Sequence, residues 1–62
     1  MVEVTRLNKE QILINAELIE MIEETPNTVI SMTTGRKLVV METKEEMVDK
    51  IVKYKQRILS LI

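Results

Sequence analysis

The sequence of 62 residues contains no cysteine, histidine, tryptophan or phenylalanine, and it has a single glycine, proline and tyrosine. Without cysteine or histidine the chain can build neither a disulfide framework nor a thiolate or imidazole zinc site. The same absence excludes Ser-His-Asp and Cys-His catalytic units. We therefore expect a binding or assembly module that has no enzymatic activity, no metal and no cofactor.

Long apolar runs and targeting signals are missing as well. The longest uninterrupted apolar stretches are Ile12–Ile14 and Leu38–Met41, whereas a helix needs about 20 predominantly apolar residues to span a bilayer. The start, Met1–Arg6, lacks the basic segment and apolar core of a secretory signal. We expect a cytoplasmic location and no membrane insertion.

Aliphatic side chains dominate the residues that are present. Apolar residues make up 45% of the chain, beside ten acidic and nine basic residues with a net charge of -1. This content is too high for a disordered segment, and the length suits one small domain near the lower limit for independent folding. We predict a single domain over residues 1–62, β-rich over 1–41 and helical over 43–62.

Short β-patterned segments separated by turns predict about five strands. Asn15 is expected to form a tight corner, Pro26 to set a turn, and Gly35 to supply a positive φ in a hairpin. Residues 19–24 also show helical spacing, but a strand is favoured because Pro26 follows closely. The fold class is therefore α+β, a small, strongly bent antiparallel sheet followed by one C-terminal amphipathic helix. The expected strands cover residues 2–7, 11–14, 19–24, 28–33 and 37–41.

The helix has a defined start and one apolar stripe. Thr43 and Glu46 are spaced as in a capping box, in which each side chain accepts a hydrogen bond from the other residue's backbone N–H. Residues at helical spacing then form the stripe, with Lys55 as its charged member. The stripe consists of Met47, Val48, Ile51, Val52, Lys55, Ile58, Leu59 and Ile62.

Positive charge is concentrated in the helix. Residues 1–46 hold nine acids and five bases, whereas residues 47–62 hold one acid and four bases. Lys50, Lys53 and Arg57 are the candidate basic surface, which could meet nucleic acid or an anionic membrane. Basic residues late in a helix are also what the macrodipole favours, and the chain lacks aromatic platforms for bases. We therefore expect no nucleic-acid binding.

Three smaller groups of residues have two interpretations each. Arg6, Arg36 and Lys37 are best assigned to the rim of the sheet, and they form a basic patch only if the first and last strands approach each other. Acidic residues near the middle of the chain are assigned to a solvated rim that discourages edge pairing, rather than to a cation site. The methionines are assigned to an aliphatic core rather than to an adaptable surface. The acids are Glu17, Glu20, Glu23 and Glu24, and the methionines are Met21, Met32, Met41 and Met47.

The aliphatic residues outnumber the positions that one helix on one small sheet can bury. The strands carry apolar residues on both faces, so a monomer would expose an apolar patch of the kind that marks interfaces. Closure of the sheet into a small barrel would bury part of this surface. We predict a homo-oligomer, and its candidate interface consists of Val29, Val39, Met41, Leu59 and Ile62.

Five segments, taken in order, carry a family resemblance that covers nearly the whole chain. They are Val4–Asn8, Ile14–Glu20, Ile22–Ile30, Thr34–Lys37 and Ile51–Lys55. Together they resemble the small FlbD/SwrD-type flagellar proteins. The resemblance implies a small cytoplasmic protein of swarming motility that supports flagellar motor output by acting on the stator units or their assembly, at the inner face of the membrane through a partner. It implies no enzymatic activity and no particular binding residues. The alternative from the residues is a small nucleic-acid-binding regulator of flagellar gene expression.

Overall fold

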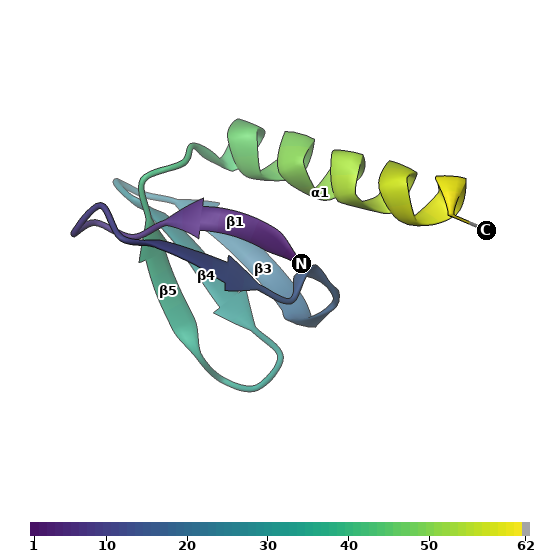
Figure 1. The fold of residues 1–62 in the computed structure, drawn as a ribbon. Coiled ribbons are helices and arrows are strands. Elements are labelled where there is room, and N and C mark those ends of the chain that lie inside the picture. The colour runs from purple at the N-terminus through teal and green to yellow at the C-terminus, as the bar shows by residue number, and fades with distance from the viewer. Residues whose placement is uncertain (62) are drawn as a thin grey trace.

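The computed structural model describes residues 1–61, which form five short strands, a 3-10 helix and an α-helix (Figure 1). The predicted α+β class, with five strands and a C-terminal helix, is confirmed. In chain order the elements are β1 (Val2–Thr5), β2 (Gln11–Ile14), η1 (Ala16–Leu18), β3 (Ile19–Glu24), β4 (Thr28–Met32), β5 (Lys37–Val40) and α1 (Lys44–Ser60).

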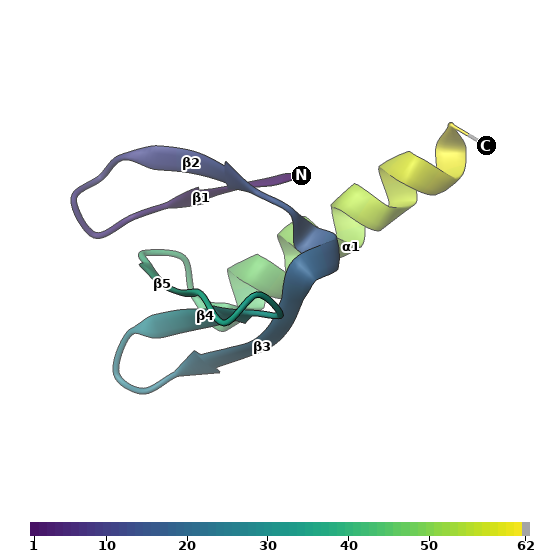
Figure 2. The ribbon, with the colours of Figure 1, turned by 90° about the horizontal axis from the view of Figure 1, so that it is seen from below.

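The strands are divided between two antiparallel sheets. β1 and β2 form a hairpin, and β3, β4 and β5 form a three-stranded sheet in that order. Arg6 makes a single bridge to Val40, and the N–H of Met41 donates to the carbonyl of Thr5 at 2.8 Å. Figure 2 shows the two sheets as separate layers connected through the corner at η1. The predicted first strand over residues 2–7 was too long, because β1 ends at Thr5 and the next residue, Arg6, makes its bridge to Val40 of β5.

The turns follow the residues that the sequence singles out. The side chain of Asn15 accepts a hydrogen bond from the N–H of Glu17 at 3.0 Å and so begins η1, as predicted. Gly35 has φ +91°, the left-handed conformation expected of the β4–β5 turn. Lys9 has φ +71° in the β1–β2 turn, where Asn8 accepts from the N–H of Glu10 at 2.9 Å.

Two carboxylates and one hydroxyl fix the start of α1. The predicted capping box is present: Thr43 Oγ1 accepts from the N–H of Glu46 at 3.1 Å, and Glu46 Oε1 accepts from the N–H of Thr43 at 2.8 Å. Glu24 Oε1, at the end of β3, accepts from the N–H of Lys44 at 3.0 Å. Orphan N–H groups of the first helical turn are thereby satisfied, and the helix is tied to β3.

The core lies between the two sheets and the first half of α1. Met47 is the helix residue at its centre, with no exposed surface, and the half-buried Tyr54 packs against the same cluster. Assigning the methionines to the core was right for Met32 and Met47 and wrong for Met21 and Met41, which are exposed. The buried cluster consists of Val2, Val4, Ile14, Ala16, Ile30, Met32, Val40 and Met47.

The second half of α1 extends beyond the strands. The helix packs chiefly against β1 and β3, and Figures 1 and 2 both show its C-terminal half projecting past them. The predicted apolar stripe is therefore only partly covered, with Met47 buried and Val48 and Leu59 exposed. Between residues 1 and 61, no helix is both long enough and apolar enough to cross a membrane.

Candidate functional site

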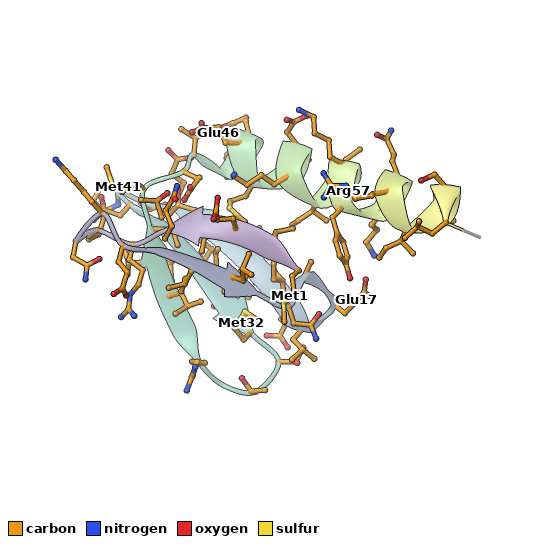
Figure 3. All side chains as sticks on the ribbon, in the orientation of Figure 1. Met1, Glu17, Met32, Met41, Glu46 and Arg57 are labelled. Carbon is orange, nitrogen blue, oxygen red and sulfur yellow. The ribbon has the colours of Figure 1, made fainter. Side chains whose placement is uncertain are left out.

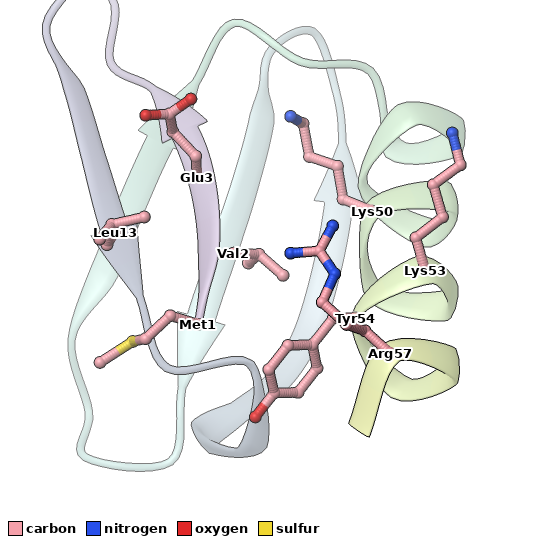
Figure 4. Close-up of a pocket in the computed structure, with 8 residues that line it drawn as sticks. All are labelled: Met1, Val2, Glu3, Leu13, Lys50, Lys53, Tyr54 and Arg57. Carbon is pink, nitrogen blue, oxygen red and sulfur yellow. The ribbon is translucent and has the colours of Figure 1, made fainter. Parts of the chain in front are cut away.

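The three predicted basic residues lie together on one side of α1. Lys50, Lys53 and Arg57 line a hollow of about 370 Å³ between the helix and the start of β1. Figure 4 shows Lys50 and Arg57 extending from the helix toward the strand of Val2 and Glu3, whereas Lys53 stays on the outer side of the helix. The spacings of three and four residues place them on one helix face, which is why sequence spacing alone could group them.

This basic face is partly neutralised and open to solvent. Lys53 Nζ lies 3.0 Å from Asp49 Oδ2, and both side chains are mostly exposed, so the pair adds little to stability. Glu3 brings a carboxylate into the same hollow. The ring of Tyr54 is half-buried against the core, which limits its use as a stacking platform for a base.

The candidate interface residues fall in two separate places. Val29 and Val39 are opposite each other on β4 and β5, and Met41 follows β5 directly. Leu59 lies near the far end of α1; in Figure 3, Met41 is labelled at the opposite end of the molecule from the second half of the helix. Ile62 lies outside the described residues. These residues therefore do not form one continuous surface within one chain.

The candidate interface left out one member of the sheet surface. Leu7 is 56% exposed, and it borders one hollow with Val39 and another with Met41. The sequence placed Leu7 in the expected first strand and among the apolar residues that a monomer would expose, but not in the interface. The available signal was an apolar residue directly before the polar turn segment Asn8–Glu10.

A groove runs along the open side of the two sheets, between β2 and β5. Its volume is about 430 Å³, and Arg6 and Arg36 border it. Arg6 also borders an adjacent hollow with Lys37, so the three basic residues are divided between two neighbouring hollows. The bridge between Arg6 and Val40 shows that the first hairpin and the last strand do approach each other. Aliphatic side chains line the rest of the groove, among them Ile12, Leu13, Leu18 and Leu38.

The charges at this groove are mainly positive. Arg6 Nη1 lies 3.6 Å from Glu10 Oε1, an exposed pair that solvent screens strongly. Within residues 1–61, neither Arg36 nor Lys37 forms an ion pair within 4 Å. The groove thus combines an aliphatic lining with one uncompensated cation, Arg36, and Lys37 adds a second at the adjacent hollow.

The side chain of Glu42 connects the segment before α1 to the end of β1. Its two carboxylate oxygens accept from the backbone N–H and the hydroxyl of Thr5, at 2.9 and 2.8 Å. Burial acts to raise the pKa of Glu42, but these hydrogen bonds, its own backbone and the charge of Lys50 outweigh burial, so the pKa lies below its ordinary value of 4.5. The ionised carboxylate holds the end of β1 to the segment before α1.

The acids of the middle segment are dispersed over the surface. Glu17 Oε1 lies 3.7 Å from Lys55 Nζ, and Glu24 caps the start of α1. Glu20 and Glu23 are exposed on β3, an edge strand. Over residues 1–61, no three acidic side chains come close enough to hold a metal ion.

Comparison with known proteins places the chain in a family. A family model described as FlbD, flagellar and swarming motility proteins, matches residues 1–59. The chain belongs to this family. Neither the curated proteins nor the solved structures gave a match. The resemblance found in the sequence is confirmed, and with it a role in flagellar and swarming motility.

Proposed function

We propose that this protein is a non-enzymatic accessory protein of flagellar motility, which supports motor output by binding a component of the motor or of its stator units. The groove between β2 and β5 is the observation that carries the proposal. Its aliphatic lining and its arginine rim have the composition of a protein-binding surface, in which an apolar centre is bordered by polar groups and arginine is enriched.

The charge of the groove defines the segment that fits it. Arg36 at the groove and Lys37 at the adjacent hollow attract carboxylates, and Leu38, which lines both, offers an apolar contact. An acidic segment with aliphatic side chains would satisfy both features. The proposed partner surface is therefore acidic and apolar.

The arrangement of polar groups supports a role without catalysis. Among residues 1–61 the buried polar residue is Thr28, and the buried cluster is otherwise apolar. The carboxylate of Glu42 is already engaged by Thr5. Catalytic acids and bases usually lie in clefts with their reactive atoms free to reach a substrate.

We also propose that the protein is cytoplasmic and that it reaches the inner face of the membrane through its partner.

Motor torque in living cells tests this proposal. Deletion of the gene should lower swarming and torque while the number of flagella stays normal, and the wild-type gene should restore both. Arg36→Glu should fail to restore torque, because it reverses a charge at the groove. Arg57→Glu is the matched control on the opposite surface and should restore torque at an equal protein level. Unchanged torque after deletion would contradict the motor role.

A second function has one observation in its favour. Lys50, Lys53 and Arg57 share one hollow on α1, as a regulator that binds nucleic acid through phosphate contacts would require. Titration of labelled RNA and duplex DNA at two salt concentrations discriminates the two functions. A regulator would bind with steep salt dependence and lose affinity in Arg57→Glu, whereas the motor role requires no such binding.

A further inference from the structure

A second apolar surface lies on α1 itself. We name it the outer stripe, and it consists of Val48, Val52, Lys55 and Leu59. The exposed fractions are 57% for Val48, 46% for Val52 and 70% for Leu59. At 3.6 residues per turn, the stripe lies about 100° around the helix from Met47, which faces the core. The stripe therefore lies to one side of the core-facing surface, with Val48 bordering a hollow with Ile22 of β3 and Lys55 Nζ 3.7 Å from Glu17 Oε1 of η1.

The spacing of the outer stripe matches helix pairing. Its members are separated by four, three and four residues, which is the alternation of the a and d positions in a heptad. A surface helix that packs only on its own core needs no such second seam. The outer stripe thus has the pattern of a helix that pairs with another helix.

The projecting half of α1 gives a second reason for a partner. Leu59 and Leu61 are exposed beyond the strands, and Leu61 is 82% exposed. Short helices without tertiary packing are marginal in water. Contact with another surface would stabilise this end of the helix and bury its leucines.

The order of charges along α1 selects the occupant. The first half of the helix holds three acids and two bases, whereas the second half holds three bases and no acid. The acids are Glu45, Glu46 and Asp49, and the bases are Lys44 and Lys50 in the first half and Lys53, Lys55 and Arg57 in the second. A parallel copy would place like charges side by side, whereas an antiparallel copy places each acidic half beside a basic half. The helix is thus electrostatically complementary to itself in the antiparallel direction.

We infer that two copies of this chain pair antiparallel through their outer stripes, related by a twofold axis. In the register that overlaps the whole stripe, Val48 faces Leu59 of the second copy and Val52 faces Lys55 of the second copy. The stem of Lys55 covers Val52. Its ammonium group lies 3.7 Å from Glu17 Oε1 of its own chain, an exposed and weak pair, and it exchanges this partner for the carboxylate of Asp49 of the second copy. Every contact occurs twice, as a twofold interface requires.

A hollow at the start of α1 receives the second helix. Its volume is about 330 Å³, and its lining includes Ile22 of β3 and Val48 of the stripe. Glu45 and Lys44 lie at the border, and Glu24 accepts a hydrogen bond from the backbone N–H of Lys44. Leu59 of the second copy would enter this hollow, with the basic second half of its helix beside these acids.

Sedimentation of the full chain and of two charge variants tests the pairing. The wild type should be a dimer that dissociates on dilution. Asp49→Lys alone and Lys55→Glu alone should each weaken dimerisation about tenfold or more, because each variant puts like charges together twice. An equimolar mixture should restore the dimer, because both opposite-charge contacts return between the two variants. Arg36→Glu, which reverses a charge outside α1, should dimerise like the wild type.

Each alternative result decides against the pairing. A wild type that stays monomeric at all concentrations overturns it, and so does a mixture of the two variants that stays monomeric. A monomeric wild type that binds vesicles of anionic lipid would assign the outer stripe to a membrane surface instead. Circular dichroism must show native helicity in both variants, and a third variant, Val52→Glu, replaces any that fails to fold. The result is independent of the motor role, which is measured in cells.

Discussion

Replacing Met47 with alanine should cost about 2–5 kcal/mol of folding free energy. The side chain has no exposed surface and joins α1 to both sheets in one cluster. Its burial contributes about 1.5–3 kcal/mol, and the cavity left behind adds to the loss because the surrounding side chains relax only partly. A domain of 62 residues has a total stability of about 3–9 kcal/mol, so this single change should bring it close to unfolding.

Urea unfolding followed by circular dichroism measures this loss at a fixed protein concentration. Met21→Ala is the matched control, since it removes the same atoms from a half-exposed position on β3. It should cost under about 1 kcal/mol. Met47→Leu conserves volume and should cost under about 1.5 kcal/mol, which keeps a folded reference if the alanine variant does not fold. Equal losses for Met47→Ala and Met21→Ala would refute the placement of α1 on the core.

Three further changes test the turn at Gly35, the helix cap at Thr43 and the partly buried carboxylate of Glu42. Thr43→Ala should lower the free energy of unfolding by about 0.5–2 kcal/mol, measured by thermal or urea unfolding. Thr43→Ser should lower it much less, because only alanine removes the hydroxyl that accepts a hydrogen bond from the N–H of Glu46. An equal loss in both variants would exclude the cap. Gly35→Ala should destabilise the fold by about 1 kcal/mol or more, because the residue has φ +91° although no atom lies within 4 Å of the new methyl group. Gly35→Asn should destabilise it less. Equal stability of the alanine variant and the wild type would contradict the assigned turn. The lowered pKa of Glu42 means that its ionised form stabilises the fold above pH 4.5 and that this contribution is lost as the pH falls below 4.5 through the folded pKa. Thermal midpoints of Glu42→Gln should therefore fall less steeply in acid than those of the wild type, and parallel profiles would rule out the contribution.

Local chemistry made most of the fold predictable. Asn15, Gly35 and the pair Thr43 and Glu46 act through their own backbone neighbourhood, so their roles can be derived from short sequence windows. The strands were predictable because β-branched and alternating residues are bounded by turn residues. The division into two sheets was not predictable, since it depends on the bridge between Arg6 and Val40, which lie far apart in sequence.

The direction of the helix faces was the harder part. The apolar stripe covers more of the helix surface than the sheets can bury, and spacing alone cannot say which edge of it meets the core. The structure buries Met47 and half-buries Ile51 and Tyr54, and leaves Val48 and Val52 outside. Tyr54 could have been found from its position seven residues after Met47 and three after Ile51. The basic face was predictable because Lys50, Lys53 and Arg57 are spaced three and four residues apart, which places them on one side of a helix.

The mass of the protein in solution tests most directly whether its exposed aliphatic surface is completed by a second copy. Sedimentation equilibrium of the unmodified chain over a wide concentration range should give twice the mass of one chain at high concentration and a reversible shift toward one chain on dilution. A single-chain mass throughout that range would contradict the account.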